Sequence, residues 1–86
     1  MRLVRFEVAD ADNASARLAC ETLARILRRK ASKPDDVIGP AQAYFGRRAN
    51  KYRWQVLVRT QSPRELLNGF EVPHGCVVDV DPINVL

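Results

Sequence analysis

Basic side chains cluster in the middle of the chain, in the stretch GRRANKYRWQ. Arg47, Arg48 and Lys51 lie in a predicted loop, and Arg53 stands just inside the next predicted strand. Cations on a loop can neutralise phosphates without being buried, and each phosphate contact on duplex DNA steepens the salt dependence by about 0.9 log units per log of salt. A solvated loop without a ligand is the alternative. The charges alone leave both interpretations open.

Two aromatic residues, Tyr52 and Trp54, stand among these cations and could stack on bases. They share a strand face with Val56 and Val58, however, which is typical of core packing. We therefore interpret both aromatics as packing residues whose polar edges reach the rim. The other face of this strand carries Arg53, Gln55, Leu57 and Arg59, so Arg59 joins the candidate phosphate contacts.

Two carboxylates near the end of the chain, Asp79 and Asp81, lie on one face of a predicted strand, about 7 Å apart. Such a pair could serve acid–base chemistry or hold a magnesium ion. In a sheet whose last strand pairs with its first, Arg2 or Arg5 would be a cross-strand neighbour. We favour this charge pairing and predict neither a catalytic nor a metal site.

The cysteines and the histidine do not form a recognisable reactive motif. Cys20 and Cys76 are far apart, each among apolar neighbours, and lack the spacing of a zinc site. We expect free buried thiols rather than a disulfide. His74, in a Pro-His-Gly turn, is expected to be only a turn residue.

The bulk composition is that of a small folded domain. The chain has 86 residues, 47% hydrophobic and 28% charged, with a formal net charge of +4. This predicts one domain over residues 1–86 with one small core, and the positive charge suits an anionic partner. No signal peptide and no apolar run of about 18 residues is present, so we expect a soluble, cytoplasmic domain without membrane contact.

The order of predicted elements is strand, helix, strand, strand, helix, strand, and all six are set by hydrophobic periodicity and turn signals. The strands are expected at 2–10, 35–45, 52–60 and 76–82, and the helices at 14–30 and 63–70. This order predicts an α+β fold of the βαββαβ, ferredoxin-like type, a four-stranded antiparallel sheet with two helices on one face.

Periodicity also predicts the buried faces. Alternation places Val4, Phe6 and Val8 inward on the first strand, and Cys76, Val78 and Val80 inward on the last. The apolar face of the first helix is predicted to hold six residues: Ala16, Ala19, Cys20, Leu23, Ile26 and Leu27. Its basic residues Arg25, Arg28, Arg29 and Lys30 form either a second phosphate contact or a solvated face.

Capping residues, prolines and glycines predict where the helices and strands begin and end. Asp10, Asp12 and Asn13 offer helix-starting oxygens, and Pro34 must follow the end of the first helix. Ser62 and Glu65 form a capping box that starts the second helix, which Gly69 can close. Gly39 and Pro40 predict a bulge or an edge position in the second strand.

Three segments resemble the C-terminal domain of the bacterial primosomal replication-restart helicase PriA: VIGPAQAYFGRRANKYRWQ, the Ser-Pro-Arg helix start, and VDVDPINVL. The opening strand and helix are similar as well, so the resemblance covers almost the whole chain. It implies a fold like that of ribosomal protein S10. It also implies a DNA-binding accessory module that contacts branched or single-stranded DNA, other primosome and helicase domains, and the tail of single-stranded-DNA-binding protein.

The same resemblance implies a pocket for that acidic, apolar-ended tail. The family often uses an arginine and, one helical turn later, a glutamine; Arg64 and Asn68 stand at the matching positions here. No GxxxxGK[ST] run or cysteine cluster occurs, so ATP, magnesium and zinc would belong to other parts of the parent helicase. We therefore expect no cofactor and no enzymatic activity.

An enzyme on this fold, such as an acylphosphatase-like phosphate hydrolase, is the third alternative. It would need a basic, glycine-rich cradle after the first strand, where this chain has the acidic stretch ADADNAS. The sequence therefore favours binding over catalysis.

Overall fold

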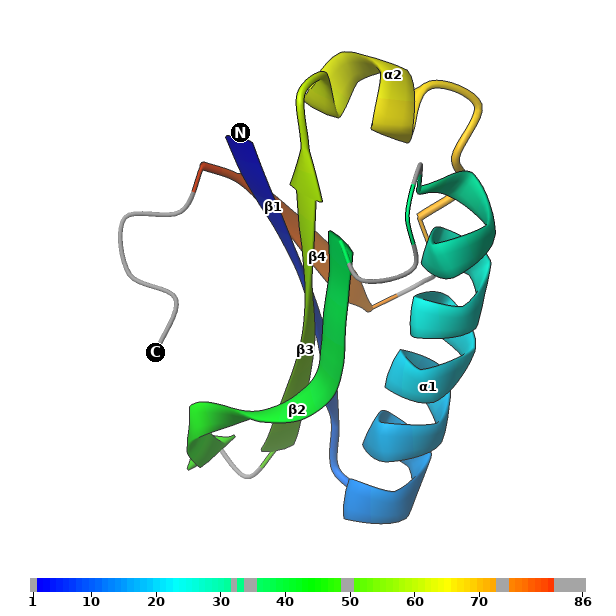
Figure 1. The fold of residues 1–86 in the computed structure, drawn as a ribbon. Helices are drawn as coiled ribbons and strands as arrows, with labels where there is room; N and C mark the ends of the chain where they lie inside the picture. Colours follow the sequence, from blue (N-terminus) through cyan, green and yellow to red (C-terminus); the bar gives the residue numbers. More distant parts are fainter. Residues whose placement is uncertain (1, 32, 34–35, 49–50, 73–74, 82–86) are drawn as a thin grey trace.

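The computed structural model describes residues 2–31, 33, 36–48, 51–72 and 75–81, and the side chains of 43–48 lie outside the description. Its elements follow the predicted order (Figure 1). They are β1 (Arg2–Asp10), α1 (Asn13–Lys30), β2 (Val37–Arg48), β3 (Lys51–Thr60), α2 (Pro63–Leu67) and β4 (Cys76–Val80). No helix among the described residues is long and apolar enough to cross a membrane.

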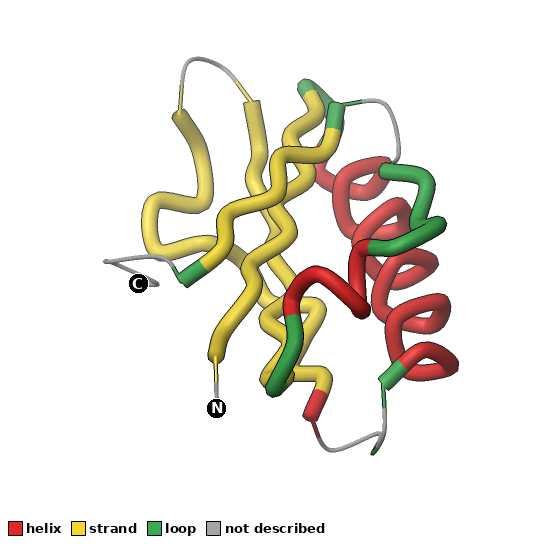
Figure 2. Tube along the Cα trace, turned by 90° about the horizontal axis from the view of Figure 1, so that it is seen from above, coloured by secondary structure: helices red, strands yellow, loops and turns green. Residues whose placement is uncertain are grey.

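The four strands form one antiparallel sheet in the order β2-β3-β1-β4. In the central strand β1, Phe6 lies opposite Val56 of β3 on one side and Val78 of β4 on the other. Both helices cover the same face of the sheet, and the other face carries no helix (Figure 2). The α+β class, the four-stranded antiparallel sheet and its two helices are confirmed.

The core lies between the sheet and α1. Val4, Phe6 and Val8 point into it as predicted, and Val56 and Val58 of β3 complete the buried face of the sheet. The helix α2 adds Leu66, and Phe70, just after it, packs edge to face on Phe6 with ring centroids 5.6 Å apart. The buried residues of α1 are Ala16, Cys20, Leu23, Ala24 and Leu27.

The predicted apolar face of α1 is partly wrong. Ala19 is exposed and Ile26 is 42% exposed, whereas Ala24 is fully buried. Helical spacing admits several overlapping apolar stripes, and packing against the sheet selects the rotation of the helix about its axis. On β4, Val80 lies opposite the core residue Val4 but stays 39% exposed at the sheet edge.

The helix ends are capped as the sequence predicts. The Asp12 carboxylate accepts hydrogen bonds from the backbone N–H and the hydroxyl of Ser15, at 3.2 and 2.7 Å. These bonds hold the pKa of Asp12 below its usual value. At α2, the Ser62 hydroxyl accepts from the Glu65 N–H at 3.3 Å, but the Ser62 N–H donates to the Thr60 hydroxyl at 3.2 Å, so only the first half of the predicted capping box forms. Gly69 follows the helix with φ +72°.

The strand β2 is an edge strand with an irregular register, as Gly39 and Pro40 predict. Its pairing with β3 shifts between Ile38 and Ala41, and again between Gln42 and Arg47. Such irregularities blunt a sheet edge that would otherwise pair with other chains. Gly39 adopts φ +121°, and a Cβ atom there would lie 2.8 Å from the Gln55 carbonyl oxygen.

We predict that Gly39→Ala lowers the free energy of unfolding by about 2–3 kcal/mol, because it adds both backbone strain and this backbone clash. Gly69→Ala is the matched control: its φ is also positive but no atom lies within 4 Å of the added methyl, so about 1 kcal/mol is expected. Urea unfolding measures both variants. Equal losses would contradict the close approach at Gly39.

Candidate nucleic-acid interface

The end of the β2–β3 hairpin brings together the predicted basic residues of the central stretch. Arg47 and Arg48 close β2, Lys51 opens β3, and the register sets Arg48 opposite Lys51 and Arg47 opposite Tyr52. The predicted loop position of the three cations is therefore wrong, because the pairing of β2 with β3 includes Arg48 and Lys51. Like charges directly opposite on two strands are destabilising. We name Arg47, Arg48 and Lys51 the hairpin cluster.

Within the hairpin cluster, Lys51 is the cation whose side chain is described. This side chain is exposed, and it makes no hydrogen bond or ion pair with the described residues. The side chains of Arg47 and Arg48 lie outside the described part of the chain, so only their backbone places them beside Lys51. A cation with no protein partner keeps its charge available to an anionic ligand.

Arg53, the next candidate along β3, is held by a carboxylate. Its guanidinium donates to Glu7 Oε1 at 2.6 Å, with side-chain exposures of 29% for Arg53 and 13% for Glu7. The sequence analysis did not anticipate this pair. Strand alternation and the register together would predict this pair. Both residues face away from the helices, and Arg53 lies opposite Ala9, two positions from Glu7.

Arg59 also has an acidic neighbour. Its guanidinium lies 3.7 Å from Oδ1 of Asp36, a buried carboxylate just before β2. Gln55, predicted to face outward between Arg53 and Arg59, is buried as well. The structure thus separates the five candidate phosphate contacts into the hairpin cluster and two arginines that face carboxylates. Binding of phosphate by any of the five residues stays a prediction.

The aromatic residues of β3 differ in their surroundings. Trp54 packs against the hydrophobic core, and its indole N–H donates to Asn13 Oδ1 at 2.8 Å, at the start of α1. Its predicted packing role, with a polar edge at the rim, is confirmed. Tyr52 is half-buried beside the hairpin cluster.

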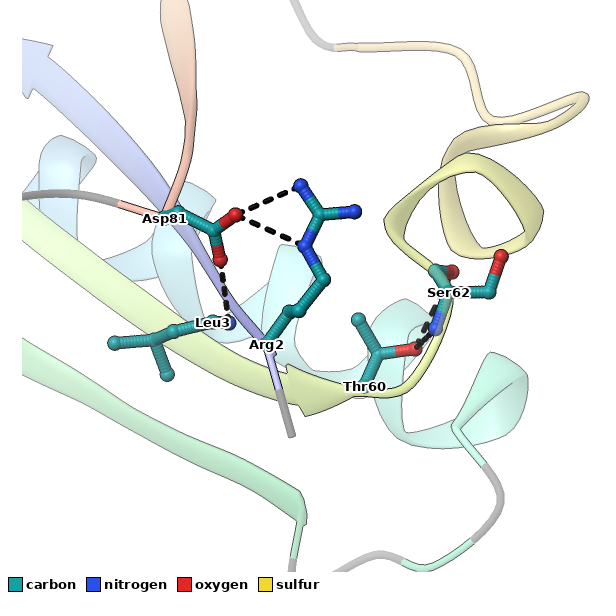
Figure 3. Close-up of polar contacts among 5 residues, drawn as sticks. All are labelled: Arg2, Leu3, Thr60, Ser62 and Asp81. Carbon is teal, nitrogen blue, oxygen red and sulfur yellow. Dashed lines mark hydrogen bonds and ion pairs between the residues drawn. The ribbon is translucent and has the colours of Figure 1, made fainter.

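The two terminal aspartates pair with arginines of β1, as predicted. Asp79 lies 3.4 Å from Arg5, and Asp81 accepts from Arg2 at 2.7 and 2.9 Å and from the Leu3 N–H at 3.2 Å (Figure 3). These hydrogen bonds from Arg2 and Leu3 hold the pKa of Asp81 below its usual value. Nowhere in the described ranges do three metal-ligating side chains of the His, Cys, Asp and Glu types gather.

The two thiols are free, as expected. Cys20 is fully buried, and desolvation raises its pKa to about 12; Cys76 is half-buried, and burial raises its pKa too. A thiol with a raised pKa is a poor nucleophile. His74 lies outside the described residues.

The model of one protein family, the primosomal protein N C-terminal domain, matches residues 1–83. The chain belongs to this family. A comparison with curated proteins gives no match. Membership gives the chain a role in the primosome and in replication restart, and it confirms the resemblance seen in the sequence.

Of the two residues predicted to bind a partner's tail, Arg64 lies on α2 and Asn68 follows its last residue. Arg64 is exposed and without a partner among the described residues, and the carbonyl of Asn68, which caps the end of α2, accepts from Lys30 Nζ at 3.5 Å. An open pocket of about 830 Å³ lies beside α2. Its lining includes the cations Lys30, Lys33 and Arg59 and the apolar residues Ala31, Val58 and Leu66.

We predict that Glu7→Gln lowers the free energy of unfolding by about 1–3 kcal/mol, because it leaves the half-buried Arg53 guanidinium without its charged partner. Chemical denaturation measures the loss. The double variant Glu7→Gln/Arg53→Gln should recover part of it, since no unpaired charge remains. Strictly additive losses in this cycle would mean that the two side chains do not interact.

Proposed function

We propose that this primosomal domain binds branched or single-stranded DNA without catalysing a reaction, and that the hairpin cluster contacts the phosphates. The observation that carries the proposal is the register that gathers Arg47, Arg48 and Lys51 at one end of the sheet. Cations opposite one another cost stability, so their presence favours a ligand that neutralises them. Contacts of this kind recognise the shape of the backbone rather than base sequence.

Arg53 and Arg59 take a secondary part in this proposal. Each already faces a carboxylate, Glu7 or Asp36, which cancels much of its field at a distance. If either arginine contacts a phosphate, its guanidinium group must bind the phosphate and its own carboxylate together. Lys51 therefore ranks first among the described candidates, and the two paired arginines follow.

The second candidate function is docking of an acidic, apolar-ended peptide, the tail of single-stranded-DNA-binding protein. The pocket beside α2 favours it, because Lys30 and Lys33 stand at its rim while Val58 and Leu66 line it. Charge-assisted hydrogen bonds would hold the peptide carboxylates, and the apolar end would enter the pocket. Arg64 lies on α2, the helix that supplies Leu66 to this lining, and Asn68 caps the end of that helix.

Other parts of a primosomal helicase are the remaining proposed partners. On this account ATP hydrolysis and any bound magnesium or zinc belong to them, and the domain adds DNA contact in the cytoplasm of a bacterial cell. The motif carrying ATP phosphates in such enzymes is missing from the 86 residues.

We predict that Arg48→Gln/Lys51→Gln weakens binding to single-stranded and forked DNA. The slope of log affinity against log salt is negative, and loss of two phosphate contacts should reduce its magnitude by about 1.4 on single strands. The control Arg2→Gln/Arg17→Gln removes two cations elsewhere, each already paired with a carboxylate, and should change the slope little. Fluorescence anisotropy measures both variants. Equal affinity of the two would rule out the hairpin cluster.

Peptide docking predicts that Arg64→Gln/Lys33→Gln weakens binding of an acidic peptide with an apolar carboxyl end by about tenfold. Isothermal titration calorimetry measures the affinity, with Arg2→Gln/Arg17→Gln as the control of equal charge. If the heat of peptide binding falls in Arg64→Gln/Lys33→Gln but not in the control, the result supports peptide docking at this pocket. An unchanged affinity, or no binding to the original chain, would contradict it.

A further inference from the structure

We propose that the C-terminal half of α1 carries a second phosphate-binding surface, formed by Arg25, Arg28 and Arg29 together with Pro40 of β2. We name the three arginines the α1 arginine cluster. The inference rests on the proposed DNA binding and extends it to another surface of the molecule. Its ligand is the phosphodiester backbone of DNA.

The cluster surrounds a shallow pocket of about 460 Å³ between α1 and the start of β2. The lining consists of Glu21, Arg25, Arg28, Arg29 and Pro40. Arg28 donates to the Gly39 carbonyl at 2.7 Å, so it joins the helix to β2 and fixes one wall of the pocket. The pocket is therefore formed by two elements that pack together, and its arginines do not project from an isolated helix.

Arg25 and Arg29 carry the available charge of this surface. Both are exposed, and neither side chain has a hydrogen bond or ion pair among the described residues. They stand one turn apart on α1, where like charges destabilise a helix by about 0.2–0.5 kcal/mol. The carboxylate in the lining, Glu21, lies 3.5 Å from Arg17, which offsets its charge.

The helix dipole alone does not account for the cluster. Cations in the last turn of a helix are favourable because they face its unpaired carbonyls, and this explains Arg28, Arg29 and Lys30. The effect fades within one turn, however, and Arg25 stands outside the last turn. Arg25 thus stands outside the reach of the dipole, and the carboxylate one turn before it, Glu21, forms its ion pair with Arg17.

A phosphate backbone fits this surface better than an acidic peptide does. Three guanidinium groups offer planar forks of donors that match phosphate oxygens, and Pro40 is the one apolar residue among the residues lining the pocket. A peptide with an apolar end needs an apolar floor, which the pocket beside α2 provides with Val58 and Leu66.

The α1 arginine cluster and the hairpin cluster lie at opposite ends of the molecule. The C-terminal end of α1 is at the top right of Figure 1, and the hairpin ends at the lower left. The longest dimension of the fold is 34 Å, about one turn of duplex DNA. Two separated clusters on different faces suit a DNA that bends or branches around the protein, so each should contribute separately to binding.

The test is Arg25→Gln/Arg29→Gln, which keeps the structural Arg28, measured by fluorescence anisotropy on forked DNA across a salt series. We expect the magnitude of the negative slope of log affinity against log salt to fall by about 1.8 if both contacts are to duplex phosphates. The control is Arg2→Gln/Arg17→Gln, with the same loss of charge. Combining the α1 variant with Arg48→Gln/Lys51→Gln should add the two reductions. If the double variant fails to fold, the single variant Arg25→Gln, which lies outside the last turn, should also weaken DNA binding and reduce its salt dependence.

The outcomes separate this inference from the proposed function. DNA binding that is weakened by the hairpin variant but not by the α1 variant would overturn the α1 arginine cluster alone. Absence of DNA binding by the original chain would overturn both. An α1 variant that loses affinity for an acidic peptide but not for DNA would make the surface a peptide site and contradict the inference. Loss of DNA affinity and salt slope, relative to the control, supports it.

Discussion

Ion pairs between neighbouring strands hold much of the positive charge of the sheet against carboxylates. Glu7 forms an ion pair with Arg53 of β3, and Asp36 forms one with Arg59 of the same strand. Asp79 and Asp81 form ion pairs with the two arginines of β1. The Glu7–Arg53 and Arg5–Asp79 pairs occupy strand positions that alternate with the core residues Val4, Phe6 and Val8, so they lie on the face of the sheet that no helix covers (Figure 2). The excess positive charge, +4 for the whole chain, therefore lies on cations outside these ion pairs. Lys51 at the hairpin, Arg25 and Arg29 on α1, and Arg64 on α2 are exposed, and their side chains form no ion pair among the described residues.

Local signals made much of the fold predictable. Alternation of Val4, Phe6 and Val8 identified the buried face of β1, since a strand has only two faces. Asp12 and Ser62 identified the helix starts, because their side chains bond to backbone N–H groups only three residues away. The pairing of Asp79 and Asp81 with β1 followed from topology alone.

Predictions that required register or packing were less accurate. Arg47 and Arg48 were expected on a loop, because their charges resemble a solvated turn, whereas strand pairing continues through them. The Glu7–Arg53 pair was missed, since it needs the register of β1 against β3. Ile26 fits an apolar stripe of α1 but lies outside the contact that the sheet selects. For the candidate site, the sequence located the cations, and only the coordinates show which have internal partners.

Backbone amide chemical-shift mapping of the labelled chain with forked DNA tests this distribution of free charge most directly. The account predicts that the largest shifts occur around Lys51, Arg25 and Arg29, at both ends of the molecule. Amides around the paired residues Arg5 and Asp79 should move little. Shifts centred on Arg5 and Asp79, with Lys51 and α1 unchanged, would contradict the claim that internal carboxylates direct DNA away from the open face of the sheet.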